Sequence, residues 1–190
     1  LKSPLLAIQL LWVNLVTDSL PAIAIGLEPP EKDIMQRKPQ DSRKGIFSDG
    51  LWNKIIVEGI MLGMLTLVAF SIGNKYYGIE VARTMAFVSI GLLELVHSFN
   101  IKSEKSIFKV GIFENKFLIG SFILGAFVQT IVLFIPSLAE IFQLVQLNKT
   151  QWIITLAISI LPIPIMELQK KVDEMKIGKI VYPIKTIKEK

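Results

Sequence analysis

Residues 11–22 read LWVNLVTDSLPA, and this stretch decides the fold because polar groups interrupt an otherwise apolar segment. The apolar segment runs from about residue 5 to residue 27, long enough to cross a hydrocarbon core of about 30 Å as a helix. A carboxylate inside such a helix is costly in lipid, so we expect Asp18 to face a bundle interior or water. The stretch therefore predicts a membrane helix with polar chemistry on one side.

Apolar and charged residues are strongly segregated along the 190-residue chain. Hydrophobic residues make up 52% of it and the mean hydropathy is +0.54, while short stretches hold most of the charge. A soluble domain of this size spreads its charges along amphipathic elements, and an outer-membrane barrel shows an alternating pattern that this sequence lacks. We predict an all-α, polytopic transmembrane helical bundle with five spans, at about residues 5–27, 51–73, 81–99, 117–135 and 152–168.

Basic residues predict how these spans are oriented. Positively charged loops stay in the cytoplasm, so we expect the first loop (28–50), the third loop and the C-terminal tail on that side. The chain then divides into a transmembrane domain at 1–170 and a basic cytoplasmic tail at 171–190. The residues that carry this argument are Lys32, Arg37, Lys38, Arg43 and Lys44 in the first loop, Lys102, Lys105, Lys109 and Lys116 around the third, and Lys170, Lys171, Lys176, Lys179, Lys185, Lys188 and Lys190 in the tail.

The composition also excludes several classes of function. There is no cysteine, so disulfides and thiolate metal sites are excluded. The net charge of +5 is explained by the loops and the tail, so we expect lipid bilayer and no nucleic acid as a partner. The chain opens at Leu1 without a signal peptide, which suggests that the upstream part of a larger polypeptide is missing. A sequence without cysteine and rich in isoleucine and lysine suits a bacterial plasma membrane.

Three polar residues of the first span share one helical face. Asn14, Thr17 and Asp18 are spaced i, i+3 and i+4, and they offer an amide oxygen, a hydroxyl and a carboxylate. Hard cations such as Ca²⁺ prefer such oxygen ligands, whereas Zn²⁺ and Cu⁺ prefer nitrogen or sulfur. The structural alternative is that Asn14 and Thr17 bond neighbouring helices while Asp18 pairs with a buried cation of the protein. The combination of three ligand types favours cation binding.

A proline follows this cluster. Pro21 has no N–H, so the carbonyl of Thr17 loses its helical partner. We expect the helix to unwind locally between Thr17 and Pro21 and to direct free carbonyls at an ion, since non-helical backbone at membrane depth is tolerated where it lines a cavity.

The third span contains a second candidate ligand. Glu94 lies well inside the membrane, and His97 and Ser98 follow one turn later, close to the predicted interface. Glu94 either completes an oxygen cage or forms an interhelical salt bridge or a protonated carboxyl group, and both interpretations remain open. His97 is expected to be an interfacial residue. Polar or helix-breaking residues in the later spans are interpreted as structural, namely Gln129, Pro162, Pro164 and Glu167.

Residues 11–22, followed by EPPEKDIM at residues 28–35, closely resemble the sixth membrane helix and the following loop of P-type Ca²⁺-ATPases. The sarco/endoplasmic-reticulum and bacterial members are the nearest in pattern. The resemblance extends over nearly the whole chain as helices six to ten of a ten-helix pump, although beyond the first loop it depends on span order and a few residues. It implies that the parent protein is an ATP-driven translocase.

The resemblance also implies roles for individual residues. The positions of Asn14, Thr17 and Asp18 bind Ca²⁺ in that family, and Glu94 matches a glutamate that completes one site. The resemblance assigns the loop at residues 28–50 to the coupling of phosphorylation to transport. Glu31 and Asp33 match its acidic cluster, although Gln36 stands where a third acid is common. ATP and Mg²⁺ would act only through upstream domains, because this chain has no phosphorylation motif and is not expected to be catalytic by itself.

Two further hypotheses stand beside the Ca²⁺ pump. A P-type pump for Mn²⁺ or Na⁺ would carry the same ligand types, because one shared aspartate does not fix selectivity. A stand-alone five-span secondary exchanger or channel subunit would require a start codon just before Leu1, so the upstream gene sequence distinguishes it. In a purely structural bundle, replacing Asp18 with asparagine would leave ion-dependent activity intact.

Overall fold

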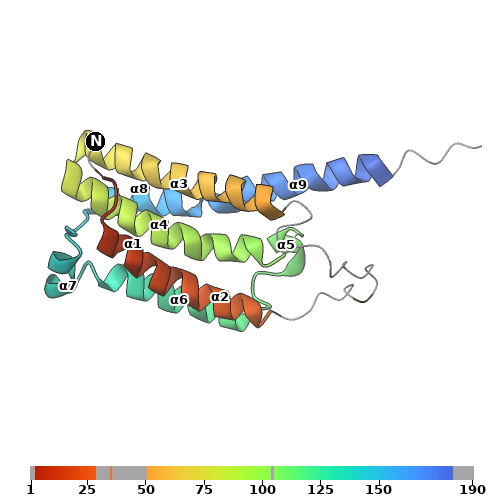
Figure 1. Ribbon diagram of the computed structural model, residues 1–190, viewed down its shortest axis with the longest axis horizontal. Helices are drawn as coiled ribbons and strands as arrows, with labels where there is room; N and C mark the ends of the chain where they lie inside the picture. Colours follow the sequence, from red (N-terminus) through yellow and green to blue (C-terminus); the bar gives the residue numbers. More distant parts are fainter. Residues whose placement is uncertain (1–2, 29–34, 36–50, 104, 182–190) are drawn as a thin grey trace, which may run out of the picture.

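Helices and the connections between them make up the part of the chain that the structure describes (Figure 1). The structure, a computed structural model, describes residues 3–28, 35, 51–103 and 105–181, and it contains no strand within these ranges. Most helices lie side by side with their long axes roughly parallel, so the bundle has two ends. We call them the α7 end, after α7 (Pro136–Ile141), and the α5 end, after α5 (Ile107–Val110). The prediction of an all-α fold is confirmed for the described residues.

The first span is one rod with a wider turn in its middle. It consists of α1 (Ala7–Val13), a π-helical segment η1 (Asn14–Asp18) and α2 (Ser19–Gly26). The expected unwinding between Thr17 and Pro21 is therefore wrong, because the backbone stays helical throughout. A π-helix pairs each N–H with the carbonyl five residues earlier, and such a local adjustment lets a membrane helix tolerate a proline.

The next two helices form a tight hairpin. α3 (Leu51–Tyr76) and α4 (Ile79–Ile101) are joined through Gly78, whose φ of 93° is a conformation that side chains rarely adopt. Near this turn a Cβ atom on Gly73 would lie 2.6 Å from the Cα atom of Ala82, so the two backbones approach as closely as a glycine permits. This contact fixes the register of the hairpin at the α7 end.

α4 is the central helix of the bundle. Nearly all its residues from Ala82 to Asn100 are buried, and it contacts α1, η1, α2, α3, α6, α8 and α9. Its polar residues are therefore surrounded by protein rather than by lipid.

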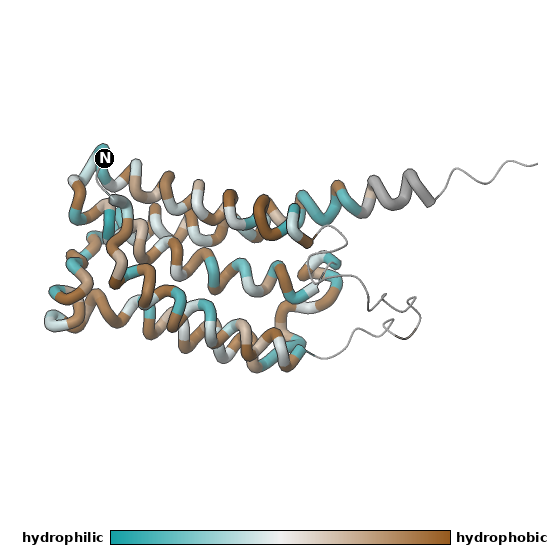
Figure 2. Tube along the Cα trace, viewed as in Figure 1, coloured by the Kyte–Doolittle hydropathy of each residue, from teal (hydrophilic) through white to brown (hydrophobic). Residues whose placement is uncertain are grey.

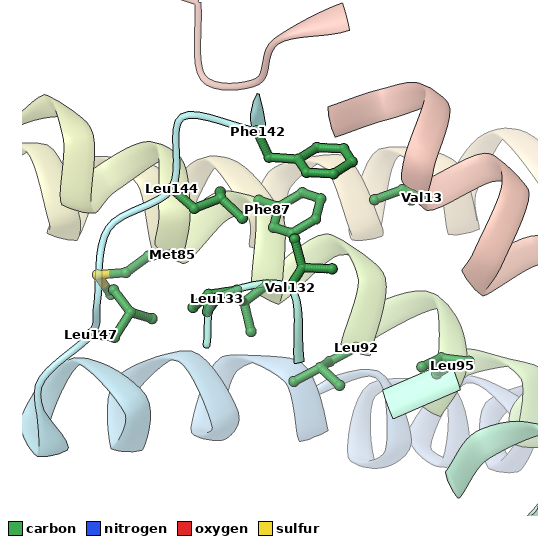
Figure 3. Packing of buried hydrophobic residues seen from close by; sticks show 11 residues of the cluster. Val13, Met85, Phe87, Leu92, Leu95, Val132, Leu133, Phe142, Leu144 and Leu147 are labelled. Carbon is green, nitrogen blue, oxygen red and sulfur yellow. The ribbon is translucent and has the colours of Figure 1, made fainter. Parts of the chain in front are cut away.

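The fourth span is shorter than predicted. α6 (Lys116–Ile131) ends four residues before the expected limit at residue 135, and α7 follows after a short turn. The connection from residue 132 to residue 148 packs over the α7 end, where Phe142 stacks on Phe87 of α4 with ring centroids 6.1 Å apart. Figure 3 shows this cluster between α1, α4 and the connection.

The last span has a break. α8 (Lys149–Ile160) and α9 (Pro162–Val181) are separated by Leu161, and Pro162 begins the second helix, where its missing N–H costs nothing. The structural role assigned to Pro162 is consistent with this geometry. α9 extends the helix well beyond the predicted limit at residue 168, and the tube in Figure 2 becomes mainly hydrophilic where α9 leaves the bundle.

Three of these rods are long and apolar enough to cross a membrane: Ala7–Gly26, Leu51–Tyr76 and Lys149–Asp173. α6 is apolar but shorter. Large apolar side chains such as Leu15, Met64 and Phe127 remain exposed on the bundle surface, which suits a lipid-facing perimeter. The chain is therefore an integral membrane helical bundle, and the fivefold span count stays a prediction.

Replacing Gly73 with alanine should separate α3 from α4, because the added Cβ would meet the backbone of Ala82. We expect a loss of about 1–3 kcal/mol, the usual cost of overpacking. The midpoint temperature of thermal unfolding of the complete purified protein measures it. Gly63→Ala is the matched control on the same helix, because nothing lies within 4 Å of its added Cβ. Equal effects of the two variants would contradict the close approach.

Candidate functional site

A cavity of about 380 Å³ opens between the first rod, α3 and α4. Its polar lining comes from Thr17 and Asp18 of η1 and from Glu94, His97 and Ser98 of α4. Pro21, Leu62 and Ile101 contribute apolar walls. The sequence placed most of these polar residues in two separate spans, and the structure brings them to one space.

Thr17 makes the direct link between the two helices. Its hydroxyl lies 2.6 Å from Oε2 of Glu94 and 2.7 Å from the carbonyl oxygen of Val13. The hydroxyl has one proton, so it donates to one of these acceptors at a time and offers its lone pairs to another partner. Thr17 is only 1% exposed, because Val13, Thr17 and Pro21 follow one another at four-residue intervals along the buried side of the rod.

Asp18 adds a second carboxylate to the same cavity. Its side chain is exposed, whereas Glu94 is half-buried. Neither carboxylate forms an ion pair with a lysine or arginine among the described residues. The alternative in which Asp18 or Glu94 neutralises a cationic side chain therefore has no support in this part of the chain. Two carboxylates and a hydroxyl form an all-oxygen group of the kind that hard cations prefer.

Asn14 lies apart from this group. It is the first residue of η1, it is exposed, and it does not line the cavity. Its carboxamide is therefore available on the surface of the rod, one turn away from Asp18.

A buried pair at the edge of the cavity was not predicted. Nε2 of His97 lies 3.1 Å from Oε2 of Glu58 on α3, and both residues are less than 10% exposed. His97 therefore faces the neighbouring helix α3, and its expected position near the membrane interface stays a prediction. Glu58 was overlooked, although a carboxylate in an apolar span is itself a signal that the side chain faces protein. The other oxygen of Glu58 and Nδ1 of His97 have no hydrogen-bond partner among the described residues.

The remaining predicted residues are structural or lie outside the described ranges. Gln129 donates from Nε2 to the carbonyl of Phe87 at 2.9 Å and fills the space above Gly91, as its structural role requires. Glu31 and Asp33 lie outside the described residues. The start of their loop is anchored, because Glu28 accepts a hydrogen bond from Asn115 and lies 3.5 Å from Nζ of Lys102.

Comparison with known proteins shows similarity to cation-transporting ATPases. A family model described as "Cation transporting ATPase, C-terminus" matches residues 2–172. Calcium-transporting ATPase 1 of Bacillus cereus is 39% identical over 186 residues, which cover 88% of this chain and 21% of that protein. The calcium-transporting ATPase of Bacillus subtilis is 37% identical over 164 residues, covering 85% of this chain and 18% of that protein. The chain thus spans about a fifth of the length of these curated relatives.

The Glu58–His97 pair should show energetic coupling across α3 and α4. Removing either partner leaves a buried polar group unsatisfied, so we expect Glu58→Ala and His97→Ala each to destabilise the protein by roughly 1–3 kcal/mol. The double variant should lose less than the sum of the two, with a coupling of at least about 0.5 kcal/mol. Thermal unfolding of the complete protein measures this cycle. Strictly additive losses would show that the pair does not interact.

Proposed function

The chain belongs to the family of cation-transporting ATPases, whose C-terminal region it matches, and from this premise we propose that it is part of the membrane domain of an ATP-driven Ca²⁺ pump. In this proposal the chain supplies part of the transport sites, and ATP hydrolysis with Mg²⁺ takes place in upstream domains of the same polypeptide. The membrane-embedded ligands are Asn14, Thr17, Asp18 and Glu94.

The observation that carries this proposal is the contact between Thr17 and Glu94. It joins the centre of the first rod to the central helix, and Asp18 lines the same cavity. Two carboxylates close to each other in a membrane protein are costly unless a cation or a partner group compensates them. Since no lysine or arginine of the described residues does so, a transported cation accounts for both charges.

Asn14 would enter the site from the exposed side of the rod. Its position at the start of η1, one turn before Asp18, leaves both side chains facing away from the buried line of Val13 and Thr17. Further oxygen ligands would come from upstream membrane helices packed against this side. The wider turn of η1 then lets side chains from both sides of the rod contribute, as π-helical segments often do at functional sites.

We further propose that all five predicted spans cross the membrane, with the α5 end in the cytoplasm. Lysine side chains at this end, including Lys102 and Lys116, support that orientation through the positive-inside rule. The loop at residues 28–50, with Glu31 and Asp33, would then face the ATP-hydrolysing domains and couple them to the cavity. Its anchored start at Glu28 lies next to the end of α2, so movement of the loop would reach the site along that helix.

Glu94→Gln and Asp18→Asn should each weaken Ca²⁺ activation of the complete pump. Each change removes one negative charge from the cavity, so we expect the Ca²⁺ concentration for half-maximal ATPase activity to rise at least roughly tenfold. Ca²⁺-stimulated ATP hydrolysis and Ca²⁺ uptake into proteoliposomes measure the effect. Glu80→Gln is the matched control, because Glu80 is an exposed glutamate of the same helix outside the cavity.

The same assay distinguishes the transported ions. If Ca²⁺ fails to stimulate the wild-type protein and Mn²⁺ or Na⁺ succeeds, the assignment to Ca²⁺ is wrong while the pump assignment stands. If Glu80→Gln matches Glu94→Gln, the cavity is not the transport site.

Thr17→Val should separate the role of the hydroxyl from the role of packing. Valine keeps the shape of threonine but cannot bind the carboxylate of Glu94 or a cation, so we expect Ca²⁺ affinity to fall by roughly tenfold. Thr17→Ser keeps the hydroxyl and should retain most of the affinity. The two variants are compared by Ca²⁺ titration of ATPase activity, and a serine variant as weak as the valine variant would assign Thr17 a packing role only.

A further inference from the structure

A second cavity lies at the α5 end, where α9 leaves the bundle beside α5 (Figure 1). Its volume is about 490 Å³, which is larger than the cavity at Glu94. The two cavities share no lining residue, so this space is separate from the proposed cation site. Three lysines line it, namely Lys109 of α5 and Lys170 and Lys171 of α9.

The apolar and cationic parts of this lining are separated along α9. Pro164, Leu168 and Lys171 follow at intervals of four and three residues, so they share one face of the helix. Both Pro164 and Leu168 are exposed, and the lysine comes last, at the end of the apolar span. The span between Pro164 and Lys171 is about 10 Å along the helix axis, from seven residues at about 1.5 Å each.

Two other lining residues hold the cavity in shape. Glu167 accepts hydrogen bonds from the hydroxyl of Ser106 and, at 2.9 Å, from the backbone N–H of Ile107. Lys170 donates from Nζ to the carbonyl of Asn100 at 2.7 Å and to that of Lys105 at 3.1 Å. These contacts join α9 to the end of α4 and to α5, so the wall is built by tertiary packing rather than by one loop.

Lys171 comes after Glu167 and Lys170, the residues of α9 that these hydrogen bonds hold in place. It is exposed, and it forms no ion pair within the described part of the chain. Lys109 reaches the same cavity from the opposite side on α5, and its side chain is also exposed. An anion in the cavity would therefore be approached by lysines from two elements.

We propose that this cavity binds one anionic phospholipid, with its phosphate at Lys109 and Lys171 and an acyl chain along Leu168 and Pro164. A soluble phosphate would use the lysines but would gain nothing from the apolar wall. A phospholipid uses both, because its charged headgroup and its hydrocarbon follow each other in the order in which α9 presents lysine and apolar side chains. The proposal goes beyond ion transport and does not depend on which cation the pump carries.

The test measures lipids retained by the complete purified protein after reconstitution in nanodiscs of phosphatidylcholine mixed with phosphatidylglycerol. Native mass spectrometry should detect one phosphatidylglycerol molecule held more tightly than phosphatidylcholine. The double variant Lys109→Gln/Lys171→Gln should bind it roughly tenfold more weakly, since each lysine near anionic lipid contributes attraction. The double variant Lys75→Gln/Lys149→Gln removes the same charge at the α7 end and should retain the lipid.

Two further arms identify the source of the phosphate. Leu168→Gln should reduce phosphatidylglycerol retention while all lysines remain, which a site for phosphate alone would not show. Soluble glycerol phosphate should fail to displace the lipid, and efficient displacement would overturn the proposal in favour of a site for free phosphate. Equal loss in the two double variants would also overturn it, because general surface charge would then explain retention. Unfolding midpoints in phosphatidylcholine alone should be unchanged in all variants, since the replaced side chains are exposed.

Discussion

The polar residues of α4 have to be kept out of lipid, and the arrangement of the other helices follows from that constraint. Glu94 and His97 lie in a helix of membrane-spanning length, where an uncompensated polar group costs several kcal/mol. The first rod, α3, α6, α8 and α9 all contact α4 and cover it. Its buried surface then allows polar contacts between helices, such as that of Glu94 with Thr17 and that of His97 with Glu58.

The π-helical segment η1 connects the local sequence to the site. Pro21 cannot donate a backbone hydrogen bond, and the rod compensates by widening over Asn14–Asp18 rather than by unwinding. The sequence located the proline and the polar residues of this rod, but it did not predict the response of the backbone. Helical backbone keeps its own polar groups satisfied at membrane depth, whereas an unwound turn needs partners from neighbouring elements. Such partners are a property of packing, which a single segment does not reveal.

The two cavities differ in what encloses them. The space at Glu94 is bounded by three helices and contains two carboxylates, while the space at the α5 end is bounded by α5 and α9 and contains three lysines. In the two proposals, the acidic groups inside the bundle bind a transported cation, and the basic groups at its end bind an anionic phospholipid. The family match agrees with the first of these proposals, and the second rests on the residues of α5 and α9 that line the cavity.

The sequence alone predicted the helical class, the approximate limits of the longer apolar helices, and the candidate residues Asp18, Thr17 and Glu94, which the structure brings to one cavity. Segregated hydropathy and buried charge are strong signals in a membrane protein, because a polar or charged group exposed to lipid costs free energy. Only the tertiary structure decided which groups meet. The contact of Thr17 with Glu94 joins residues 77 positions apart, and the pair of His97 with Glu58 depends on the rotation of α3 against α4. Helix periodicity assigns a residue to a face, but the neighbour of that face is set by the packing of the whole bundle.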